Sequence, residues 1–279
     1  MKILNDISLA SYTTMKIGGI AKKLYFPETI SDLEEILNHC EEIRILGNGS
    51  NLLINDESMF QNVICLKAFN HFIRWNGEYI EAGSGVSLHS LIEEINEHGY
   101  GGIEYLYSVP GLLGGGIAMN AGRGAAYHMA ISDYLVSVKV MQQRKIVTLS
   151  KEECHFAYRD SRFKNGNEII LSAIFAFDKI DKAYAEDRRK ERMSYAKEIQ
   201  DLSYPNLGST FCKANPLIMG FMSRISFGRR GIYFSKKTKN WLQNKGKGTF
   251  RDAMFCIKVA KWLHKILDKE CQTEYVIWK

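Results

Sequence analysis

The hydrophobic pattern of residues 1–67 changes its period along the chain, which predicts a small α/β unit. A strand-like apolar run at Lys23–Phe26 precedes Ser31–Cys40, where apolar residues recur at the 3.6-residue spacing of a helix. Ser31 and Glu34 have the spacing of a capping box, so we expect the helix to begin there. Short apolar runs on both sides of residues 47–51 predict two further strands joined by a polar loop.

Residues 68–178 combine alternating and helical patterns. Ser87 is expected to begin a helix that Gly99 ends. Its inward face should consist of Leu88, Leu91, Ile92 and Ile95. The valines of residues 136–140 alternate with polar residues, which predicts a half-exposed strand with residues 146–149 as its hairpin partner. The apolar run Ile169–Phe177 is too short to cross a bilayer and predicts a buried strand.

The last third of the chain is more charged. Residues 179–200 favour a helix, which we expect to connect into a third region. Thr249–Lys269 is predicted to form the last long helix, and Tyr275–Trp278 a final strand. The stripe of this helix expected to face the core consists of Phe255, Val259, Leu263 and Ile266 or Leu267.

Six of the 23 glycines fall between Ser108 and Gly124, and three of them are consecutive. Glycine permits positive φ and lets another molecule approach the backbone closely, but ordering it costs conformational entropy. The stretch is otherwise apolar, which argues against a solvated linker. Two interpretations stay open at this point. One is a row of backbone N–H groups that binds an anion such as a pyrophosphate, and the other is a tight packing corner between two sheets.

A second glycine loop, Gly47–Asn51, favours the anion-binding interpretation. A dinucleotide-binding Rossmann unit would need a third glycine where Leu52 stands and a helix after the loop. Another strand-like run follows instead, so we expect the loop to join two strands. Ser50 and Asn51 add side-chain hydrogen-bond donors to its backbone N–H groups.

Composition narrows the class of protein. The net charge is +6, and basic clusters gather late in the chain, at residues 188–190, 229–230, 236–237 and 245–247. Such clusters fit a nucleic acid, an anionic small molecule such as a nucleotide sugar or NADPH, or a solvated surface without a partner. The six cysteines lack CxxC spacing, which predicts free thiols in a reducing cytoplasm. The seven histidines lack metal-ligand spacing and the first residues lack the apolar core of a signal peptide, so we expect neither a metal site nor export.

Five sequence elements occur in one order over nearly the whole chain. They are GNGSNLLI at 47–54, SVPGLLGGGIAMNAG at 108–122, YRDS at 158–161, GSTF at 208–211 and TEYV at 273–276. None is specific alone, but as a set they resemble the UDP-N-acetylenolpyruvoylglucosamine reductase family, the MurB flavoenzymes of peptidoglycan synthesis. The sequence lacks a tyrosine-bearing insertion between Gly208 and the last helix, so it resembles the shorter, type II form of that family.

The resemblance implies an α+β fold, with a two-lobed FAD-binding region of the PCMH/VAO type and a smaller α+β substrate-binding domain. We expect the first FAD-binding lobe at residues 1–67, the second at 68–178, and the substrate-binding domain at 179–279, with its C-terminal strand returning toward the active site. The resemblance also implies non-covalent FAD. The residues expected to bind it are Gly47, Asn48, Gly49, Ser50, Asn51, Gly111, Gly114, Gly115, Gly116, Asn120, Ala121 and Gly122.

The reaction that the resemblance implies has two halves. NADPH, as co-substrate, would reduce the FAD, and the enolpyruvyl ether of UDP-N-acetylglucosamine would then be reduced to UDP-N-acetylmuramate. Hydride addition at C3 leaves carbanion character at C2, which requires donors at the neighbouring carboxylate and an acid at C2. By match, Arg159 and Glu274 hold and polarise the carboxylate, and Ser209 delivers the proton. The residues expected to bind the substrate are Tyr158, Lys213 and Asn215.

Three departures from the family pattern lie in the substrate-binding region. The GSTF element continues into a longer segment, Cys212–Pro216, Thr238 stands where the family usually has a histidine, and Leu217–Tyr233 is unusually basic and aromatic. The alternative is therefore a diverged flavin-binding paralogue that acts on, or merely binds, a different anionic substrate, and a nucleic-acid binder is a third hypothesis. We expect a cytoplasmic, monomeric oxidoreductase of peptidoglycan and cell-wall synthesis, with a nucleotide sugar and NADPH as partners and neither membrane nor nucleic acid.

Overall fold

The computed structural model describes residues 1–225 and 230–279, which divide into two compact units. Unit 1 contains residues 1–3, 24–48 and 62–196, and unit 2 contains residues 4–23, 49–61 and 197–279. Both units mix helices with sheets, which confirms the expected α+β class. The finer division into lobes at 1–67, 68–178 and 179–279 remains a prediction.

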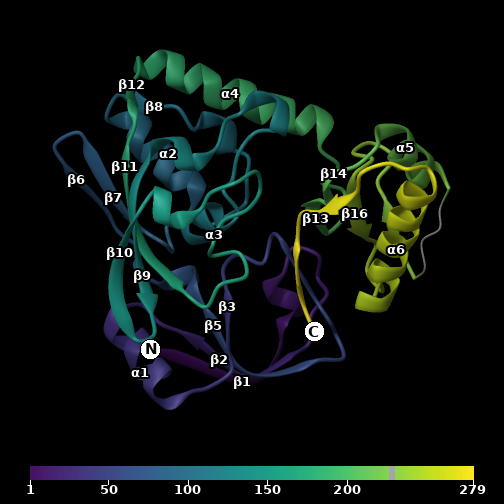
Figure 1. Ribbon diagram of the computed structural model, residues 1–279, viewed down its shortest axis with the longest axis horizontal. Helices are drawn as coiled ribbons and strands as arrows, with labels where there is room; N and C mark the ends of the chain where they lie inside the picture. The colour runs from purple at the N-terminus through teal and green to yellow at the C-terminus, as the bar shows by residue number, and fades with distance from the viewer. Residues whose placement is uncertain (226–229) are drawn as a thin grey trace. The chain divides into compact units, whose positions relative to one another are not determined.

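The largest sheet of the described residues belongs to unit 1 and has five antiparallel strands in the order β10-β9-β11-β7-β6 (Figure 1). The strands are β6 (Ile73–Asn76), β7 (Tyr79–Gly83), β9 (Leu135–Gln142), β10 (Lys145–Ser150) and β11 (Ile169–Ala176). Helices α2 (Leu88–Glu97) and α3 (Leu113–Ala118) share an apolar core with this sheet. As expected, Ser87 caps α2, and Gly99 follows its end with a φ of 77°.

The expected alternation in β9 holds for Val138 and Val140, which are buried, but not for Val136, which is 41% exposed. The pairing with β11 shifts register here, since Ile174 opposes Ser137 while Phe175 opposes Leu135. Val136 is therefore the extra residue of a β-bulge, and Leu135 is buried in its place.

A second core of unit 1 forms around α1 (Ile30–His39). Strand β3 (Ile43–Leu46) runs parallel to β5 (Met59–Cys65) beside it, and the sheet order is β1-β2-β5-β3 with β1 (Lys2–Ser8) and β2 (Ile20–Phe26). The expected cap of α1 was wrong. Thr29 caps the helix and forms the capping box with Asp32, because these two side chains, rather than Ser31 and Glu34, bond each other's backbone N–H groups.

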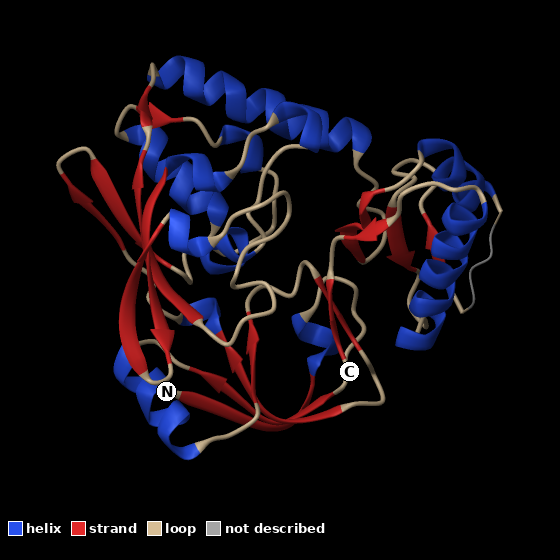
Figure 2. Cartoon of the chain, in the orientation of Figure 1, coloured by secondary structure: helices blue, strands red, loops and turns tan. Residues whose placement is uncertain are grey.

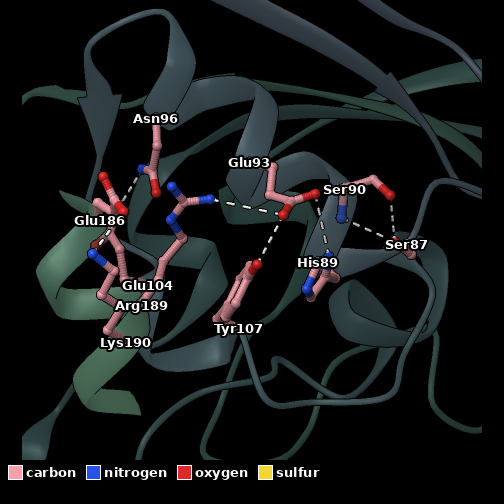
Figure 3. Close-up of polar contacts among 10 residues, drawn as sticks. All are labelled: Ser87, His89, Ser90, Glu93, Asn96, Glu104, Tyr107, Glu186, Arg189 and Lys190. Atoms are coloured by element: carbon pink, nitrogen blue, oxygen red, sulfur yellow. Dashed lines mark hydrogen bonds and ion pairs between the residues drawn. The ribbon is translucent and has the colours of Figure 1, made fainter. Parts of the chain in front are cut away.

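The charged segment forms α4 (Lys182–Ile199), which confirms the predicted helix. Its buried residues are only two alanines, and polar groups attach it to α2 (Figure 3). Arg189 Nη1 lies 3.8 Å from Glu93 Oε1, which also accepts a hydrogen bond from Tyr107 Oη at 2.8 Å. The His89 ring stacks on Tyr107 with centroids 4.0 Å apart. Beside them, β8 (Tyr100–Gly101) pairs with β12 (Asp178–Lys179).

Unit 2 is built on a three-stranded sheet in the order β13-β16-β15, whose core it shares with α5 (Pro216–Arg224) and α6 (Phe250–Ile266) (Figure 2). The strands are β13 (Asn206–Ser209), β15 (Ile232–Phe234) and β16 (Trp241–Asn244). Strand β14 (Phe211–Lys213) pairs with β17 (Gln272–Thr273), and the predicted final strand, β18 (Val276–Trp278), runs parallel to β4 (Leu52–Ile54). Short 3₁₀ helices lie at Leu9–Tyr12, Leu66–Ala68, Glu104–Leu106, Ala125–Tyr127, Ile131–Tyr134 and Glu152–Cys154.

The predicted core stripe of α6 was right only in part, since Phe255, Val259 and Leu263 are half-buried against the core while Ile266 and Leu267 are exposed. The fully buried side chains are Phe250, Asp252, Ala253, Cys256, Ile257, Ala260 and His264. Small residues form much of this buried face, so the helix can approach the sheet closely. Among the described residues, we find no helix with the length and apolar character needed to cross a membrane.

Candidate active site

The two predicted cofactor loops meet in unit 1. The loop after β3 begins with Gly47 and Asn48, and Asn48 Nδ2 donates a hydrogen bond to Pro110 O at 2.7 Å. A β-carbon placed on Gly47 would meet no other heavy atom of the described residues within 4 Å. The chain after the loop continues into β4, so the predicted strand–loop–strand arrangement is confirmed.

The three consecutive glycines lie in α3, in ordinary helical geometry. The first N–H groups of this helix are already used, because Leu113 N donates to Val86 O at 2.8 Å and Gly114 N to Ser84 O at 2.9 Å. A β-carbon on Gly114 would come within 3.0 Å of Ser84 Cβ, whereas one on Gly115 would meet no described atom outside the helix within 4 Å. Gly114 is therefore a packing glycine, as the second interpretation expects, and Gly115 borders open space, while the first N–H groups of the helix bond the protein rather than an anion.

Buried polar atoms beside this helix support a ligand. Within the described part of the chain, Asn120 Oδ1 and Ser84 Oγ are buried without a hydrogen-bond partner. Leaving such a group unsatisfied costs about 1–3 kcal/mol, so a bound polar molecule would recover that free energy. Open space at Gly115 and Gly47 together with these atoms fits a flat, polar cofactor such as FAD.

The turn that carries Tyr158 and Arg159 is attached to the end of α3. Asn120 Nδ2 donates to Ala157 O at 3.0 Å, and Ser161 Oγ donates to Ala118 O at 2.7 Å. Two backbone hydrogen bonds between Ala157 and Asp160, of 3.0 and 3.1 Å, close the turn. Arg159 sits at its tip with a φ of 56°, a left-handed conformation that costs an L-residue about 1–2 kcal/mol.

The remaining loop residues, Gly49–Asn51, belong to unit 2. Gly49 has a φ of 65°, and a β-carbon there would clash with Tyr12 O, so this position requires glycine. Thr14 N donates to Gly49 O at 3.1 Å, while Thr14 Oγ1 donates to Asn206 O at 2.7 Å. Thr14 thus joins the predicted cofactor loop to the strand that ends at Ser209.

Ser209 and Glu274 come together in unit 2 through backbone hydrogen bonds. Glu274 N donates to Thr210 O at 3.0 Å, directly after Ser209. Asn51 Nδ2 donates to Glu274 O at 3.4 Å, and Val276 N donates to Asn51 O at 3.0 Å. The structure therefore gathers the end of the cofactor loop, Ser209 and Glu274 in one unit, whereas Arg159 and the glycine stretch lie in the other.

Two predicted substrate-binding residues also have structural roles. Asn215 caps α5, because its Oδ1 accepts from Leu217 N and Ile218 N at 3.0 and 3.3 Å. A substrate contact by Asn215, which remains a prediction, would therefore fall to its Nδ2 group. Lys213 Nζ lies 3.3 Å from Glu270 Oε1 at the surface.

Thr238, the residue in place of the family's usual histidine, has a structural role. Its Oγ1 donates to Ile199 O at 2.7 Å and accepts from Asp201 N at 2.8 Å. The hydroxyl therefore fixes the chain as it leaves α4.

Sequence reasoning missed three residues that support the site: Thr14, Ser84 and Ser161. Ser161 was inside a recognised element, and Gly83 and Gly85 mark the turn of Ser84, so both had a local signal. The bond of Thr14 spans 192 positions of sequence, and a single sequence offers no sign of such a contact.

Comparison with known proteins places these observations in a family. A family model described as an FAD binding domain matches residues 21–148. The chain is 33% identical to a UDP-N-acetylenolpyruvoylglucosamine reductase from Thermotoga sp. strain RQ2, over 97% of this chain and 91% of that protein. It is 32% identical to the reductase of Fusobacterium nucleatum, over 94% and 93% of the two chains.

A solved structure supports the fold. The crystal structure of UDP-N-acetylenolpyruvylglucosamine reductase (MurB) from Thermus caldophilus matches with a TM-score of 0.82 over 100% of this chain and 98% of that chain, at 24% identity. The relatives and this chain cover nearly all of one another's length, so the likeness is not confined to one domain. The chain belongs to the UDP-N-acetylenolpyruvoylglucosamine reductase family.

Proposed function

We propose that this protein is an FAD-dependent oxidoreductase that uses NADPH to reduce UDP-N-acetylglucosamine enolpyruvate to UDP-N-acetylmuramate, a step of peptidoglycan precursor synthesis. The observation that carries the proposal is the attachment of the Arg159 turn to the glycine helix through Asn120 and Ser161. It fixes a guanidinium-bearing turn at the end of the helix that contains Gly115, and an anionic substrate above a flat cofactor would need such a fixed positive charge.

The residues that would hold FAD are those of the two glycine loops. Gly47 and Gly115 leave room for it, and the buried Asn120 Oδ1 and Ser84 Oγ are available to hydrogen-bond its polar groups. When bound, FAD supplies the two-electron relay between NADPH and the enolpyruvyl group.

Three side chains of the protein would bind the substrate carboxylate and supply the proton for C2. Arg159 supplies fixed positive charge at the substrate carboxylate, which it holds and polarises together with Glu274. Ser209 delivers the proton to C2. A hydroxyl is a weak acid, so this transfer depends on the charge that develops at C2 and on correct positioning of Ser209.

We further propose a monomer located in the cytoplasm. The six cysteines are thiols rather than disulfides, which fits a reducing compartment. The nucleotide-phosphate contacts expected from the basic last third would use Arg230 and Lys237, while Arg229 lies outside the described residues.

Anaerobic absorbance spectroscopy of the purified protein tests the activity. We expect yellow protein that releases FAD on denaturation, loses its flavin absorbance with NADPH, and regains it with the enolpyruvyl nucleotide. Colourless protein that cannot be reconstituted with FAD would refute the flavoenzyme. Flavin that NADPH reduces but the enolpyruvyl nucleotide does not reoxidise would favour the paralogue with another substrate, and the same titration with NADH measures nucleotide preference.

A further inference from the structure

Large apolar side chains are exposed on both helices of unit 2. On α5, Leu217 is 84% exposed and Phe221, one turn later, is 48% exposed. On α6, Trp262 is 59% exposed and Ile266, one turn later, is 58% exposed. Single exposed apolar residues are normal on protein surfaces, but two pairs at i, i+4 spacing form a contiguous stripe on each helix.

The charges on α6 are almost all of one sign. Its exposed lysines are Lys258, Lys261 and Lys265, followed by Lys269 just after the helix. Across the described residues, no carboxylate lies within ion-pair distance of these four ammonium groups. The face is therefore both apolar and positively charged.

Helix α4 shows that the chain can build a charged helix differently. There Lys190 pairs with Glu186 at 2.7 Å (Figure 3). Arg188 pairs with Glu191 at 3.8 Å in the same helix. Its exposed face holds alternating charges, which is typical of a solvated surface. The unpaired lysines of α6 and its exposed Trp262 depart from that pattern.

The two apolar stripes belong to the same end of the helix pair. Asn215 N, at the start of α5, donates to His264 Nε2, near the end of α6, at 2.8 Å. Leu217 lies in the first turn of α5 and Ile266 closes α6, and the two helices lie side by side in Figure 1.

We propose that this α5–α6 surface docks on membranes rich in anionic phospholipid. Tryptophan and aliphatic side chains flanked by lysines are the composition of a helix that lies in a bilayer interface, where the apolar groups enter the acyl boundary and the ammonium groups remain with the phosphates. On such a membrane the lysines would contact anionic lipid phosphates, and the exposed apolar side chains would move from water into the acyl region. An acidic protein would satisfy the charges but would also need a groove for four large side chains.

The proposal is independent of the reaction, because none of these residues belongs to the candidate active site. It also goes beyond the expectation of no membrane partner, which rested on the lack of a spanning segment. A peripheral contact of this kind requires no spanning helix.

Co-sedimentation of the purified full-length protein with vesicles tests the proposal. We expect binding to vesicles of equal phosphatidylglycerol and phosphatidylcholine, weakened by salt, and little binding to phosphatidylcholine alone. Lys261→Glu/Lys265→Glu should weaken binding by at least ~10-fold, since each basic residue near an anionic surface contributes to attraction. Trp262→Ser keeps the charge and should weaken binding several-fold by removing the inserted side chain.

The matched control is Lys182→Glu/Lys190→Glu on α4, which makes the same change in net charge and should bind within about twofold of the unaltered protein. If both double variants lost vesicle binding equally, net charge alone would explain the effect, and the proposal would be overturned. Failure of the unaltered protein to bind the anionic vesicles would also overturn the proposal. Binding to soluble polyglutamate but not to vesicles, with the same sensitivity to Lys261 and Lys265, would favour an acidic protein partner instead.

Discussion

The two units hold the residues predicted to act in the reaction by different means. In unit 1, side chains of Asn120 and Ser161 attach the Arg159 turn to the backbone of the glycine helix. In unit 2, main-chain hydrogen bonds place Glu274 beside Thr210 and Val276 beside Asn51. Side chains add to this support, since Asn240 Nδ2 donates to Phe211 O at 2.8 Å and Thr210 Oγ1 accepts from Leu242 N at 3.2 Å.

This difference in support predicts different effects of substitutions in the two units. Side-chain substitutions should disturb the position of Arg159, because particular atoms hold its turn. Substitution of Ser209 or Glu274 itself should leave the backbone there in place, because the main-chain hydrogen bonds beside these residues remain, so the effects should report chemistry. The following four predictions test this contrast, from the largest expected effect to the smallest.

Gly115→Val should abolish FAD binding without destabilising the protein. The added side chain meets no described atom outside its helix at the β-carbon, so it fills only the space proposed for the cofactor. Equilibrium dialysis with FAD and thermal unfolding of the FAD-free protein measure the two effects, and Gly115→Ala should be intermediate. Full FAD occupancy in the valine variant would mean that the stretch is only a packing corner, contrary to the proposed cofactor site.

Ser209→Ala should slow reoxidation of the flavin by the enolpyruvyl nucleotide by about 10²–10⁴-fold, the usual contribution of a positioned general acid. Flavin reduction by NADPH should stay near its normal rate, and FAD content should not change. Stopped-flow absorbance follows both halves in one sample. Equal slowing of both would show that Ser209 positions the cofactor, and no slowing would remove its proposed role.

Ser161→Ala should slow the same second half-reaction by about 10-fold, because loss of a buried hydrogen bond costs on the order of 1.4 kcal/mol and loosens the Arg159 turn. Ser161→Thr, which keeps the hydroxyl, should restore most of the rate. If the alanine variant instead lost FAD or unfolded early, Ser161 would be supporting the fold rather than Arg159.

Asp201→Asn should alter stability and leave the turnover rate near normal. Burial raises the pKa of Asp201, but hydrogen bonds from Ser235, Ser203 and Gln243 outweigh it and lower the pKa from 3.8 to about 2. The ionised carboxylate therefore stabilises the folded state above about pH 4, and this contribution is lost as the pH falls toward 2.

At pH 7 the asparagine variant should be about 1–2 kcal/mol less stable, with some of the full shift screened by solvent. Urea unfolding between pH 7 and pH 2 should show the gap closing in acid. A gap that is constant with pH would assign the loss to packing, and a large fall in turnover would show that Asp201 also supports the predicted site residues of unit 2.

Local chemistry in the sequence predicted much of the fold. The helices that begin at Ser87 and Thr249, the β9–β10 hairpin and the final strand all have signals within a few residues, and the structure confirms them. The core face of α6 was predicted only in part, because its buried centre includes small and polar residues such as Ala253, Ala260 and His264, which carry little hydrophobic signal. The bulge at Val136 depends on the neighbouring strand in the same way.

The residues of the candidate site could be predicted from the sequence, but the contacts that pack and support them could not. Glycine clusters indicate close backbone approach, so the two loops stood out. The sequence could not separate Gly114, which packs on Ser84, from Gly115, which borders open space, because that depends on a turn thirty positions earlier. For the same reason the supporting contact of Thr14 with Asn206 had no local signal.

The left-handed backbone of Arg159 bears on how the chain can change over evolutionary time. Glycine or asparagine would occupy that position at lower conformational cost, so mutation without selection for the reaction should replace the arginine. A relative that has given up the chemistry should therefore show the loss first at this turn, with a gain in stability.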